Sequence, residues 1–265
     1  MDILERIVAD KRVEVAATKA AFPEEALRER LPFAPPPVPF RESLLASRHG
    51  IIAEFKRKSP SRGWIHEDVD PEQVVPAYDA AGAAALSILT DGPYFGGCLD
   101  YVVRMRPMVK APVLRKEFII DPYQLVEARA AGADAVLLIA SCLDRGTFRA
   151  LLDEAHALGL QVLLEVHSPD ELDYVSSEVD ALGVNNRHLG TFHTDVEVSF
   201  RMASELRRRG LTGPGGPALV SESGIDSPGT VRRLRDEGFR GFLMGECFMK
   251  EKDPGAALAA FIEAL

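Results

Sequence analysis

The sequence predicts a (β/α)8 barrel with an N-terminal helical extension, and three observations support this prediction. Eight short apolar runs alternate with eight helical stretches from residue 50 onward. The runs show no polar alternation, which is typical of parallel strands buried on both faces. The eight units are of similar length, as in a barrel of this kind. A doubly wound open sheet is the alternative, and the even count favours the barrel.

The extension covers residues 1–48. An amphipathic helix is predicted for residues 2–20, because Ile3, Leu4, Ile7, Val8, Lys11 and Val15 recur at helical spacing. The proline-rich stretch 32–40 predicts a connector. Because the extension is too small to fold alone, we expect residues 1–265 to form a single domain with the extension packed on the barrel.

The strands and helices of the barrel follow in order. The predicted strands are 50–55, 83–89, 111–116, 134–140, 160–166, 181–186, 217–223 and 241–246. The predicted helices are 71–81, 98–108, 122–131, 144–158, 168–177, 195–209, 227–237 and 254–264. Several helices open beside a proline, which the first turn tolerates, and several end near a glycine that can take a left-handed cap.

Composition narrows the function classes. The chain has 265 residues and a net charge of −9, so bulk electrostatics give no support to nucleic-acid binding. The start has no apolar signal region, and no apolar run approaches the roughly 18 residues that span a membrane. The three cysteines lack metal-like CxxC spacing. We expect a cytoplasmic protein without membrane or nucleic-acid partners. The oligomeric state stays open, and a monomer is compatible with the sequence.

Polar residues gather at the carboxyl end of each predicted strand, whereas the opposite ends are plain. They include Glu54, Lys56, Lys116, Glu165, Asn185, Arg187, Glu222, Ser223 and Glu246. In a (β/α)8 barrel these ends converge on one face, which is where active sites lie. Burying this many charges is costly unless they pair or bind something, and shifted pKa values suit acid–base chemistry. The sequence therefore predicts an active site at this mouth.

Two stretches predict a phosphate site. "SESGI" (221–225) and "LMGECFM" (243–249) end the last two strands, and the loops at these positions form the recurrent phosphate site of this fold. The backbone N–H groups of Gly224, Gly245 and Glu246 could face the phosphate oxygens. The carboxylate of Glu246 would have to point away, because it would repel the anion.

The chain resembles the indole-3-glycerol phosphate synthase family over essentially its full length. The resemblance is carried by "IIAEFKRKSPSRG", "LSILTDGPYFGG", "VLRKEFIIDPYQ", "LLEVH", "GVNNRHLGTF", "VSESGI" and "FLMGECFM", in this order at the strand ends, and by "ILERIVADKRVEV" in the extension. It implies a lyase of tryptophan biosynthesis that converts 1-(2-carboxyphenylamino)-1-deoxyribulose 5-phosphate to indole-3-glycerol phosphate with loss of CO2 and water. It also implies that neither a metal nor an organic cofactor is needed.

The resemblance implies roles for the matching residues. Lys116 would be the general acid of ring closure. Lys56 would act on the carboxylate of the anthranilate part or as the acid of dehydration, and Glu165 would take part in the later acid–base step. The sequence does not decide which of Lys56 and Glu165 serves which proton. Glu54 and Asn185 would orient these groups, Arg187 would hold an anionic group, and Glu222 and Ser223 would line the site. The remaining substrate-binding residues would be Ser59, Pro60, Phe95, Phe118, Gly224, Leu243, Gly245 and Glu246. Gly97 stands where we would expect serine in the family.

The loop 59–63 is expected to close over the substrate, with Gly63 as its pivot and Lys58 as a loop cation outside the site. Two other functions are compatible with the sequence. One is a Schiff-base aldolase with Lys116 or Lys56 as nucleophile, and the other is a scaffold that binds a phosphate ligand without catalysis. The intact set of lysines and glutamates disfavours the scaffold. A metalloenzyme is a weak alternative, because His188 and His193 are more typical of loop histidines.

Overall fold

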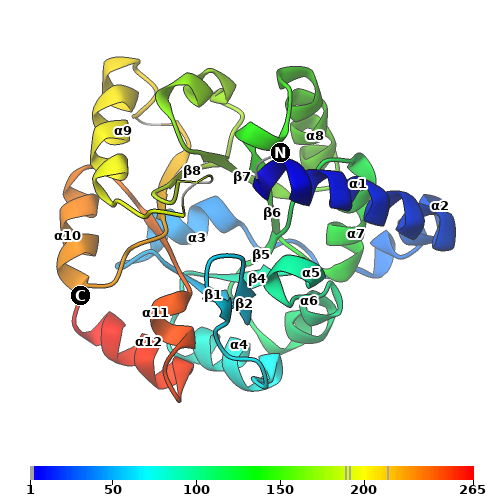
Figure 1. Ribbon diagram of the computed structural model, residues 1–265, viewed down its shortest axis with the longest axis horizontal. Coiled ribbons are helices and arrows are strands. Elements are labelled where there is room, and N and C mark those ends of the chain that lie inside the picture. The colour runs from blue at the N-terminus through cyan, green and yellow to red at the C-terminus, as the bar shows by residue number, and fades with distance from the viewer. Residues whose placement is uncertain (1–2, 189, 191, 214) are drawn as a thin grey trace.

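The barrel is closed, as predicted, and the open doubly wound sheet is wrong. The computed structural model describes residues 3–188, 190, 192–213 and 215–265; residue 2 of the first predicted helix and Leu189 and Thr191 of the "GVNNRHLGTF" motif lie outside them. The parallel strands follow the circular order β1-β10-β9-β8-β7-β6-β5-β4 (Figure 1). Their bounds are β1 Ile51–Phe55, β4 Ala85–Leu89, β5 Val113–Lys116, β6 Ala135–Ile139, β7 Gln161–Val166, β8 Ala181–Asn185, β9 Ala218–Glu222 and β10 Gly241–Met244.

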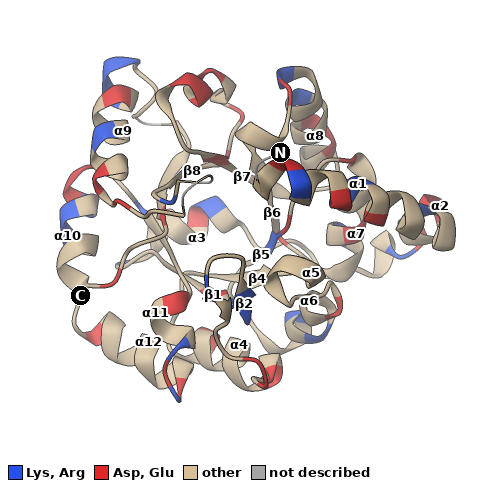
Figure 2. Cartoon of the chain, in the orientation of Figure 1, with Lys and Arg blue, Asp and Glu red and all other residues tan. Residues whose placement is uncertain are grey.

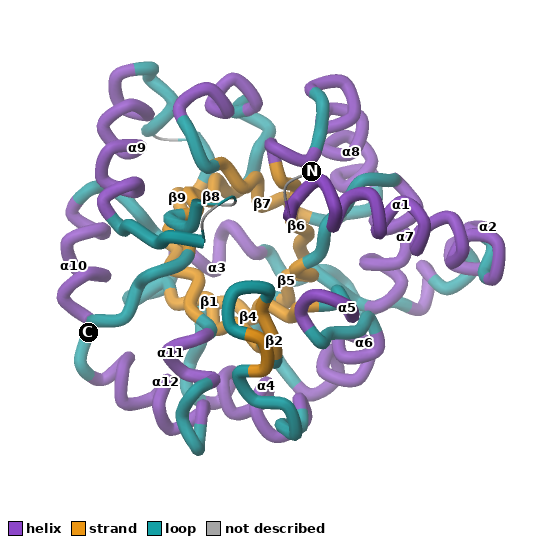
Figure 3. The backbone as a smooth tube through the Cα atoms, in the orientation of Figure 1, coloured by secondary structure: helices purple, strands orange, loops and turns teal. Residues whose placement is uncertain are grey.

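Helices surround the strands as an outer ring (Figure 3). They are α4 Pro71–Ala80, α6 Asp100–Met105 with η2 Arg106–Met108, α7 Pro122–Ala131, α8 Arg145–Ala157, η4 Pro169–Tyr174, α9 Glu197–Arg208, α10 Pro228–Asp236 and α12 Pro254–Glu263. Two short helices, α5 Gly92–Phe95 and α11 Glu246–Met249, lie after β4 and β10. The prediction for 168–177 is wrong in type, because this segment forms a short 3-10 helix instead of an α-helix.

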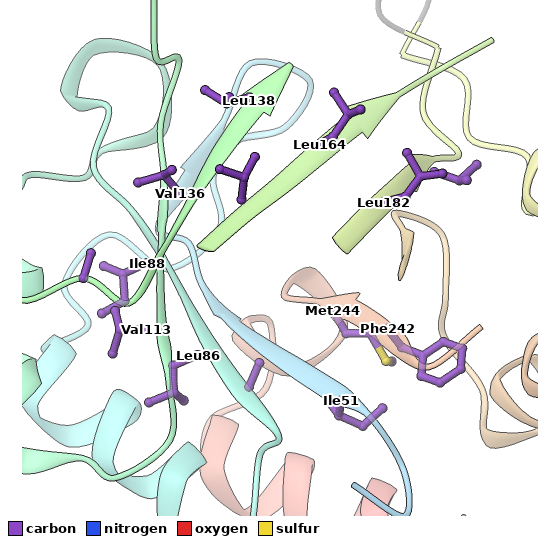
Figure 4. Packing of buried hydrophobic residues seen from close by; sticks show 14 of the residues in the cluster. Ile51, Leu86, Ile88, Val113, Val136, Leu138, Leu164, Leu182, Phe242 and Met244 are labelled. Carbon is purple, nitrogen blue, oxygen red and sulfur yellow. The ribbon is translucent and has the colours of Figure 1, made fainter. Parts of the chain in front are cut away.

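Successive strand residues face the helices and the barrel interior in turn. The outward set packs in one continuous layer under the helices and includes Ile51, Leu86, Val113, Val136, Leu164, Leu182 and Phe242 (Figure 4). The inward set includes Ile52, Leu114, Leu137, Leu163, Val220 and Leu243. Near the carboxyl ends the inward positions change from apolar to charged, so the floor of the mouth is apolar and its lining is ionic.

A short helix that the sequence did not predict, α3 Phe40–Ala46, closes the opposite end of the barrel. Phe40 and Leu44 are fully buried and pack in the interior cluster with Ile52 and Leu243. Figure 3 shows α3 through the middle of the ring of strands. Because this plug fills the amino-terminal end, the open end of the barrel interior is the carboxyl mouth.

The N-terminal extension packs on the barrel through α1 Ile3–Ala21 and α2 Glu24–Arg28. Figure 1 shows α1 lying beside α7 and α8. Lys19 pairs with Asp121 at 2.7 Å, and the hydroxyl of Tyr123 donates to the Phe22 carbonyl at 2.8 Å. The segment 34–39, within the proline-rich connector, is irregular, and the backbone N–H of Val38 donates to Asp134 at 2.7 Å.

The outer surface carries charges of both signs, interspersed over the outer helices (Figure 2). No helix among the described residues is long and apolar enough to cross a membrane.

The segment after β1 differs in part from the predicted loop. Lys58–Ser59 (β2) pairs antiparallel with Gly63–Trp64 (β3), so a small hairpin replaces an open loop. Lys58 lies in β2, and its ammonium donates to the Pro93 carbonyl at 2.9 Å and faces the Trp64 ring at 5.5 Å from the ring centre. Lys58 therefore lies in a short strand and not in a loop, while its position outside the site agrees with the prediction, because it does not line the pockets at the carboxyl mouth.

Candidate active site

The carboxyl mouth of the barrel holds two adjoining pockets, of about 140 Å³ and about 550 Å³. All of the predicted site residues line one or both. The first pocket contains Glu54, Lys56, Ser59, Pro60, Phe95, Lys116, Phe118, Glu165, Asn185, Arg187, Glu222, Ser223 and Leu243. Gly224, Gly245 and Glu246 line the second, which shares Glu54, Lys56, Arg187, Ser223 and Leu243 with the first. Sequence reasoning thus placed these residues in one region, while their roles remain a prediction.

Lys116, at the end of β5, is the centre of the first pocket. Its ammonium lies 2.5 Å from Glu222 on β9 and 3.2 Å from Glu165 on β7. Burial by itself disfavours the charge on Lys116, but Glu222, Glu165 and Glu54 outweigh burial, and they raise the pKa of Lys116 above its usual range. Lys116 is therefore an ammonium group at neutral pH, held among three carboxylates.

Glu222 is the carboxyl group of this cluster whose pKa lies nearest to neutral pH. Burial is the largest cause of its shift, Lys116 opposes it, and Glu165 and Glu54 add to it, which raises the pKa of Glu222 to about 7. The side chain is 1% exposed, and its Oε1 has no hydrogen-bond partner among the described residues. It lies against Gly183 on β8, where an added β-carbon would be 2.1 Å from this Oε1. Glycine at position 183 is what makes room for the carboxylate.

Glu54 and Lys56 face the same side of the first strand, as their spacing predicts. The ammonium of Lys56 lies 2.6 Å from Oε1 of Glu54. Burial disfavours the charge on Glu54, but Lys56 and Lys116 outweigh burial and lower its pKa. An added β-carbon at Gly245 would lie 2.8 Å from the same carboxylate oxygen, so this glycine also gives space to a charged side chain.

Glu165 is held by one neighbour at the end of β8 and by another that directly follows its own strand. Asn185 donates from Nδ2 to Oε1 of Glu165 at 3.1 Å, and Nε2 of His167 lies 3.2 Å from the same oxygen. Burial disfavours the charge on Glu165, but Lys116, His167 and Asn185 outweigh burial and lower its pKa below the usual range. Glu165 is thus an ionised carboxylate at neutral pH and has the capacity to accept a proton.

His167 is a site residue that sequence reasoning missed. It lies behind Glu165, and Nδ1 is 3.7 Å from Glu171, although neither ring nitrogen has an aligned hydrogen bond among the described residues. Burial lowers the pKa of His167, but Glu165 and Glu171 outweigh burial and raise it to about 10. The motif "LLEVH" contained this histidine, and its position two residues after Glu165 on the same face was the available signal.

The second pocket is bordered by guanidinium groups. Arg62, in the turn of the hairpin, lies 2.9 Å from Glu246, and Arg187 lies 3.9 Å from the other oxygen of that carboxylate. Arg187 also donates to the Ser61 hydroxyl at 3.1 Å. The carboxylate of Glu246 is therefore compensated by two cations, and Arg187 connects the hairpin to the end of β8.

The end of β9 has an unusual backbone. Ser223 has a φ of 68° and Gly224 a φ of 74°, both in the left-handed region. For a residue with a β-carbon, this conformation costs of order 1–3 kcal/mol and persists only where the surroundings impose it. Both residues line the second pocket, so the strain lies at the site.

One wall of the first pocket is apolar. The rings of Phe95 and Phe118 lie 6.0 Å apart, as expected for an aromatic pocket. The α1 residues Ile3, Leu4 and Ile7 complete this wall, a contribution that the sequence did not predict. Behind it, an added β-carbon at Gly97 would lie 2.1 Å from the Leu89 carbonyl, so the backbone here has no room for the serine expected at that position.

A second buried lysine anchors α1 next to this wall. Lys11 is 2% exposed, and its ammonium lies 2.9 Å from Glu14, 3.0 Å from Asp91 and 3.1 Å from Glu117. Asp91 accepts the backbone N–H groups of Tyr94 and Phe95. We define these four side chains, Lys11, Glu14, Asp91 and Glu117, as the anchor cluster. Among the described residues there is no group of three or more His, Cys, Asp or Glu side chains that could hold a metal ion.

Known proteins resemble the chain over its whole length. The sequence profile described as indole-3-glycerol phosphate synthase matches residues 4–261. The indole-3-glycerol phosphate synthase of Bacteroides thetaiotaomicron is 52% identical over 100% of this chain and 99% of the relative, and that of an Azoarcus species is 42% identical over 98% of each.

Solved structures show a related fold at low sequence identity. A mutant tryptophan synthase alpha-subunit from Pyrococcus furiosus matches with a TM-score of 0.60 and 13% identity, over 82% of this chain and 97% of that one. This likeness concerns the fold alone. Together, the profile match, the identities over the full chain and the ionic mouth of the closed barrel lead to one conclusion: the chain belongs to the indole-3-glycerol phosphate synthase family.

Proposed function

We propose that the mouth of the barrel closes the indole ring of indole-3-glycerol phosphate, with Lys116 as the general acid. The observation that supports this most is the position of one ammonium group among three ionisable carboxylates beside an apolar aromatic wall. The substrate has matching parts: a carboxyphenyl ring, a carbonyl and a phosphate. We also propose that residues 1–265 act as one domain, to which the extension 1–48 contributes part of the pocket.

In the first step, the ring carbon that carries the carboxylate attacks the carbonyl carbon of the ribulose chain. A carbon–carbon bond forms, and the carbonyl oxygen takes a proton from Lys116. The alkoxide that would otherwise form is a stronger base than an amine, so a lysine with a raised pKa can still protonate it. Glu222, whose pKa is about 7, can return a proton to Lys116 across their 2.5 Å contact.

Three bonds then break. The ring carboxylate leaves as CO2, and its bonding electrons restore the aromatic ring. The new hydroxyl leaves as water, and a proton leaves the carbon next to nitrogen, which forms the double bond of the indole. We assign the acid of this step to Lys56, which lies between the two pockets, and the base to Glu165, whose low pKa keeps it ionised. Glu54 and Asn185 position these two groups.

The phosphate of the substrate would occupy the second pocket. Arg62 and Arg187, which contact Glu246 in the free protein, would turn to the phosphate, and the turn at Ser223 and Gly224 would supply backbone N–H groups. Ser59 and Pro60 of the hairpin would close over the substrate, and Leu243 would form the floor between the pockets. Phe95 and Phe118 would pack on the carboxyphenyl ring.

We propose that one chain suffices, without metal or organic cofactor, because every acid, base and anion-binding group named here comes from the same barrel. A monomer would therefore be active. We also propose a cytoplasmic location, in keeping with the free thiols of Cys98 and Cys247, since reducing compartments keep cysteines unpaired.

Turnover tests the proposal directly. Purified protein mixed with 1-(2-carboxyphenylamino)-1-deoxyribulose 5-phosphate should produce indole fluorescence and release one CO2 for each product. A folded sample that binds the substrate without forming indole would reject it. Borohydride reduction during turnover should trap no covalent adduct, because Lys116 is an ammonium group and a poor nucleophile. A trapped adduct would instead support the Schiff-base aldolase.

A further inference from the structure

The side chain of Asn186 joins the ends of β8 and β9, and the proposed reaction leaves it unused. It is 2% exposed and makes four hydrogen bonds. Nδ2 donates to the Ser221 hydroxyl at 3.1 Å and to the Ser223 carbonyl at 3.0 Å. Oδ1 accepts the Ser199 N–H at 3.0 Å and the Ser199 hydroxyl at 2.8 Å. The partners fix the amide orientation, because the Ser199 N–H can only donate and the Ser223 carbonyl can only accept.

These contacts act on the strained turn from two sides. The carbonyl that Nδ2 holds belongs to Ser223, whose φ is 68°. The main-chain carbonyl of Asn186 accepts the N–H of Asp195 at 3.0 Å, which fixes the neighbouring Thr194. Thr194 in turn lies against Gly224, where an added β-carbon would be 2.5 Å from its methyl group. Asn186 therefore holds Ser223 directly and Gly224 through the loop that packs on it.

We propose that Asn186 is a positioning residue for the phosphate arm of the substrate: it holds the Ser223–Gly224 turn in its left-handed conformation and thereby aims that turn into the second pocket. The inference rests on the proposed function in so far as the second pocket takes a phosphate. A residue that acts in this way should affect anion binding more than the chemical step. Removal of the Asn186 side chain should also weaken anion binding less when residue 223 is one that adopts positive φ without strain.

A double-mutant cycle tests this mechanism. In the wild-type background, Asn186→Ala should raise KM, and the inhibition constant of inorganic phosphate, about tenfold with a smaller change in kcat. In a Ser223→Gly background the same substitution should raise both by less than about threefold, because glycine takes the left-handed region freely. Equal factors in the two backgrounds would overturn the proposal, because they would show that Asn186 does not act through the conformation of residue 223.

Ser199→Ala is the matched control. It removes a hydroxyl that bonds to Asn186 on the side away from the turn, and it leaves the contact to Ser223 in place. We expect lower stability in urea but a phosphate inhibition constant within about twofold of wild type. If Ser199→Ala weakens phosphate as much as Asn186→Ala does, Asn186 acts through general stability and the proposal fails.

Asn186→Asp covers the case in which the alanine variant does not fold. The aspartate keeps the shape and the acceptor for Ser199 but loses the donor to Ser223. Its loss of phosphate affinity should again be relieved by Ser223→Gly; a loss that persists there would arise from the added charge and would overturn the proposal. If the wild-type protein shows no turnover but the double-mutant cycle gives the expected changes in phosphate binding, the proposed reaction is rejected and the role of Asn186 stands.

Discussion

Lys116 and Lys11 are two buried lysines surrounded by carboxylates, yet their surroundings suit different purposes. In the anchor cluster, each carboxylate oxygen of Asp91 and Glu117 has a partner. Oδ1 of Asp91 accepts two backbone N–H groups and Oδ2 faces Lys11, while the oxygens of Glu117 accept from the Phe118 N–H and the Thr90 hydroxyl. Such a cluster is complete and can only hold the fold together.

The cluster around Lys116 is incomplete. Glu222 leaves one oxygen without a partner among the described residues, its pKa is about 7, and Lys116 is 13% exposed to the pocket, against 2% for Lys11. Unsatisfied groups and shifted pKa values are what proton transfer requires and what stability alone would remove. The comparison teaches that a buried lysine indicates function when the carboxylates around it still have an unpaired oxygen or a pKa near neutrality.

The largest effect should come from Lys116→Ala. Removing the general acid should lower kcat by about 10³-fold or more, while inorganic phosphate still binds in the second pocket. Steady-state kinetics by indole fluorescence and phosphate inhibition measure the two quantities. Turnover within about tenfold of wild type would show that Lys116 is not the general acid, and that the carboxylates around it, like the anchor cluster, serve only the fold.

Lys11→Met should show the opposite pattern. It leaves the buried carboxylate of Asp91 without a cation and that of Glu117 with only Arg115, 3.9 Å away, so the free energy of unfolding should fall by about 3–5 kcal/mol. The kcat of the folded fraction should change by less than about threefold, because Lys11 touches no reacting atom in the proposed mechanism. Urea unfolding and kinetics below the transition provide the test. A large loss of kcat with unchanged stability would contradict the structural role of the anchor cluster.

Glu222→Gln should change how stability depends on pH. Because the pKa of Glu222 is raised from 4.5 to about 7, the folded protein keeps a proton that the unfolded chain releases between these values. Stability from this group therefore falls as pH rises through that window, by an amount of the order of 3 kcal/mol. The variant should lack this fall. Unfolding free energies of both proteins at either end of the window measure it, and parallel pH profiles would show that Glu222 is already ionised.

Gly183→Ala should disturb the active cluster by sterics alone. The new β-carbon would lie 2.1 Å from Oε1 of Glu222 and should push this carboxylate away from Lys116. We expect kcat to fall about tenfold, since the proton return to Lys116 is weakened. Gly229→Ala is the control, because an added β-carbon there meets nothing closer than 3.9 Å. Equal kinetics of the two variants would mean that the position of Glu222 does not matter.

The strands were predictable because their signal is local. Each is a short apolar run that ends in polar residues, and the closed barrel brought Glu54, Lys116, Glu165 and Glu222 together as expected. The helices were predictable where prolines and glycines mark their ends. Within the segment 168–177 the structure has a 3-10 helix, Pro169–Tyr174. The proline therefore marked correctly where the helix begins, but it did not indicate the type or the length of the helix.

What the sequence could not reveal depends on distant partners. Lys11 was placed among the residues at helical spacing in the first predicted helix, but its partners Asp91 and Glu117 come from the ends of two later strands. The plug α3 and the hairpin at Lys58 are short, so their pattern is too weak to read without the surfaces they cover. Asn186 is the last residue of the predicted strand 181–186, but only its hydrogen bond to Ser223 and the backbone angle of Ser223 show what it holds.

The anchor cluster also makes the docking of α1 depend on the barrel. The carboxylates that receive Lys11 belong to the ends of β4 and β5, so they lie side by side only where these two strands are paired. The contacts that hold α1 are therefore distant in sequence, and such contacts cost more chain entropy to form than local ones. Because α1 also lines the first pocket, completion of the pocket wall is coupled to completion of the barrel.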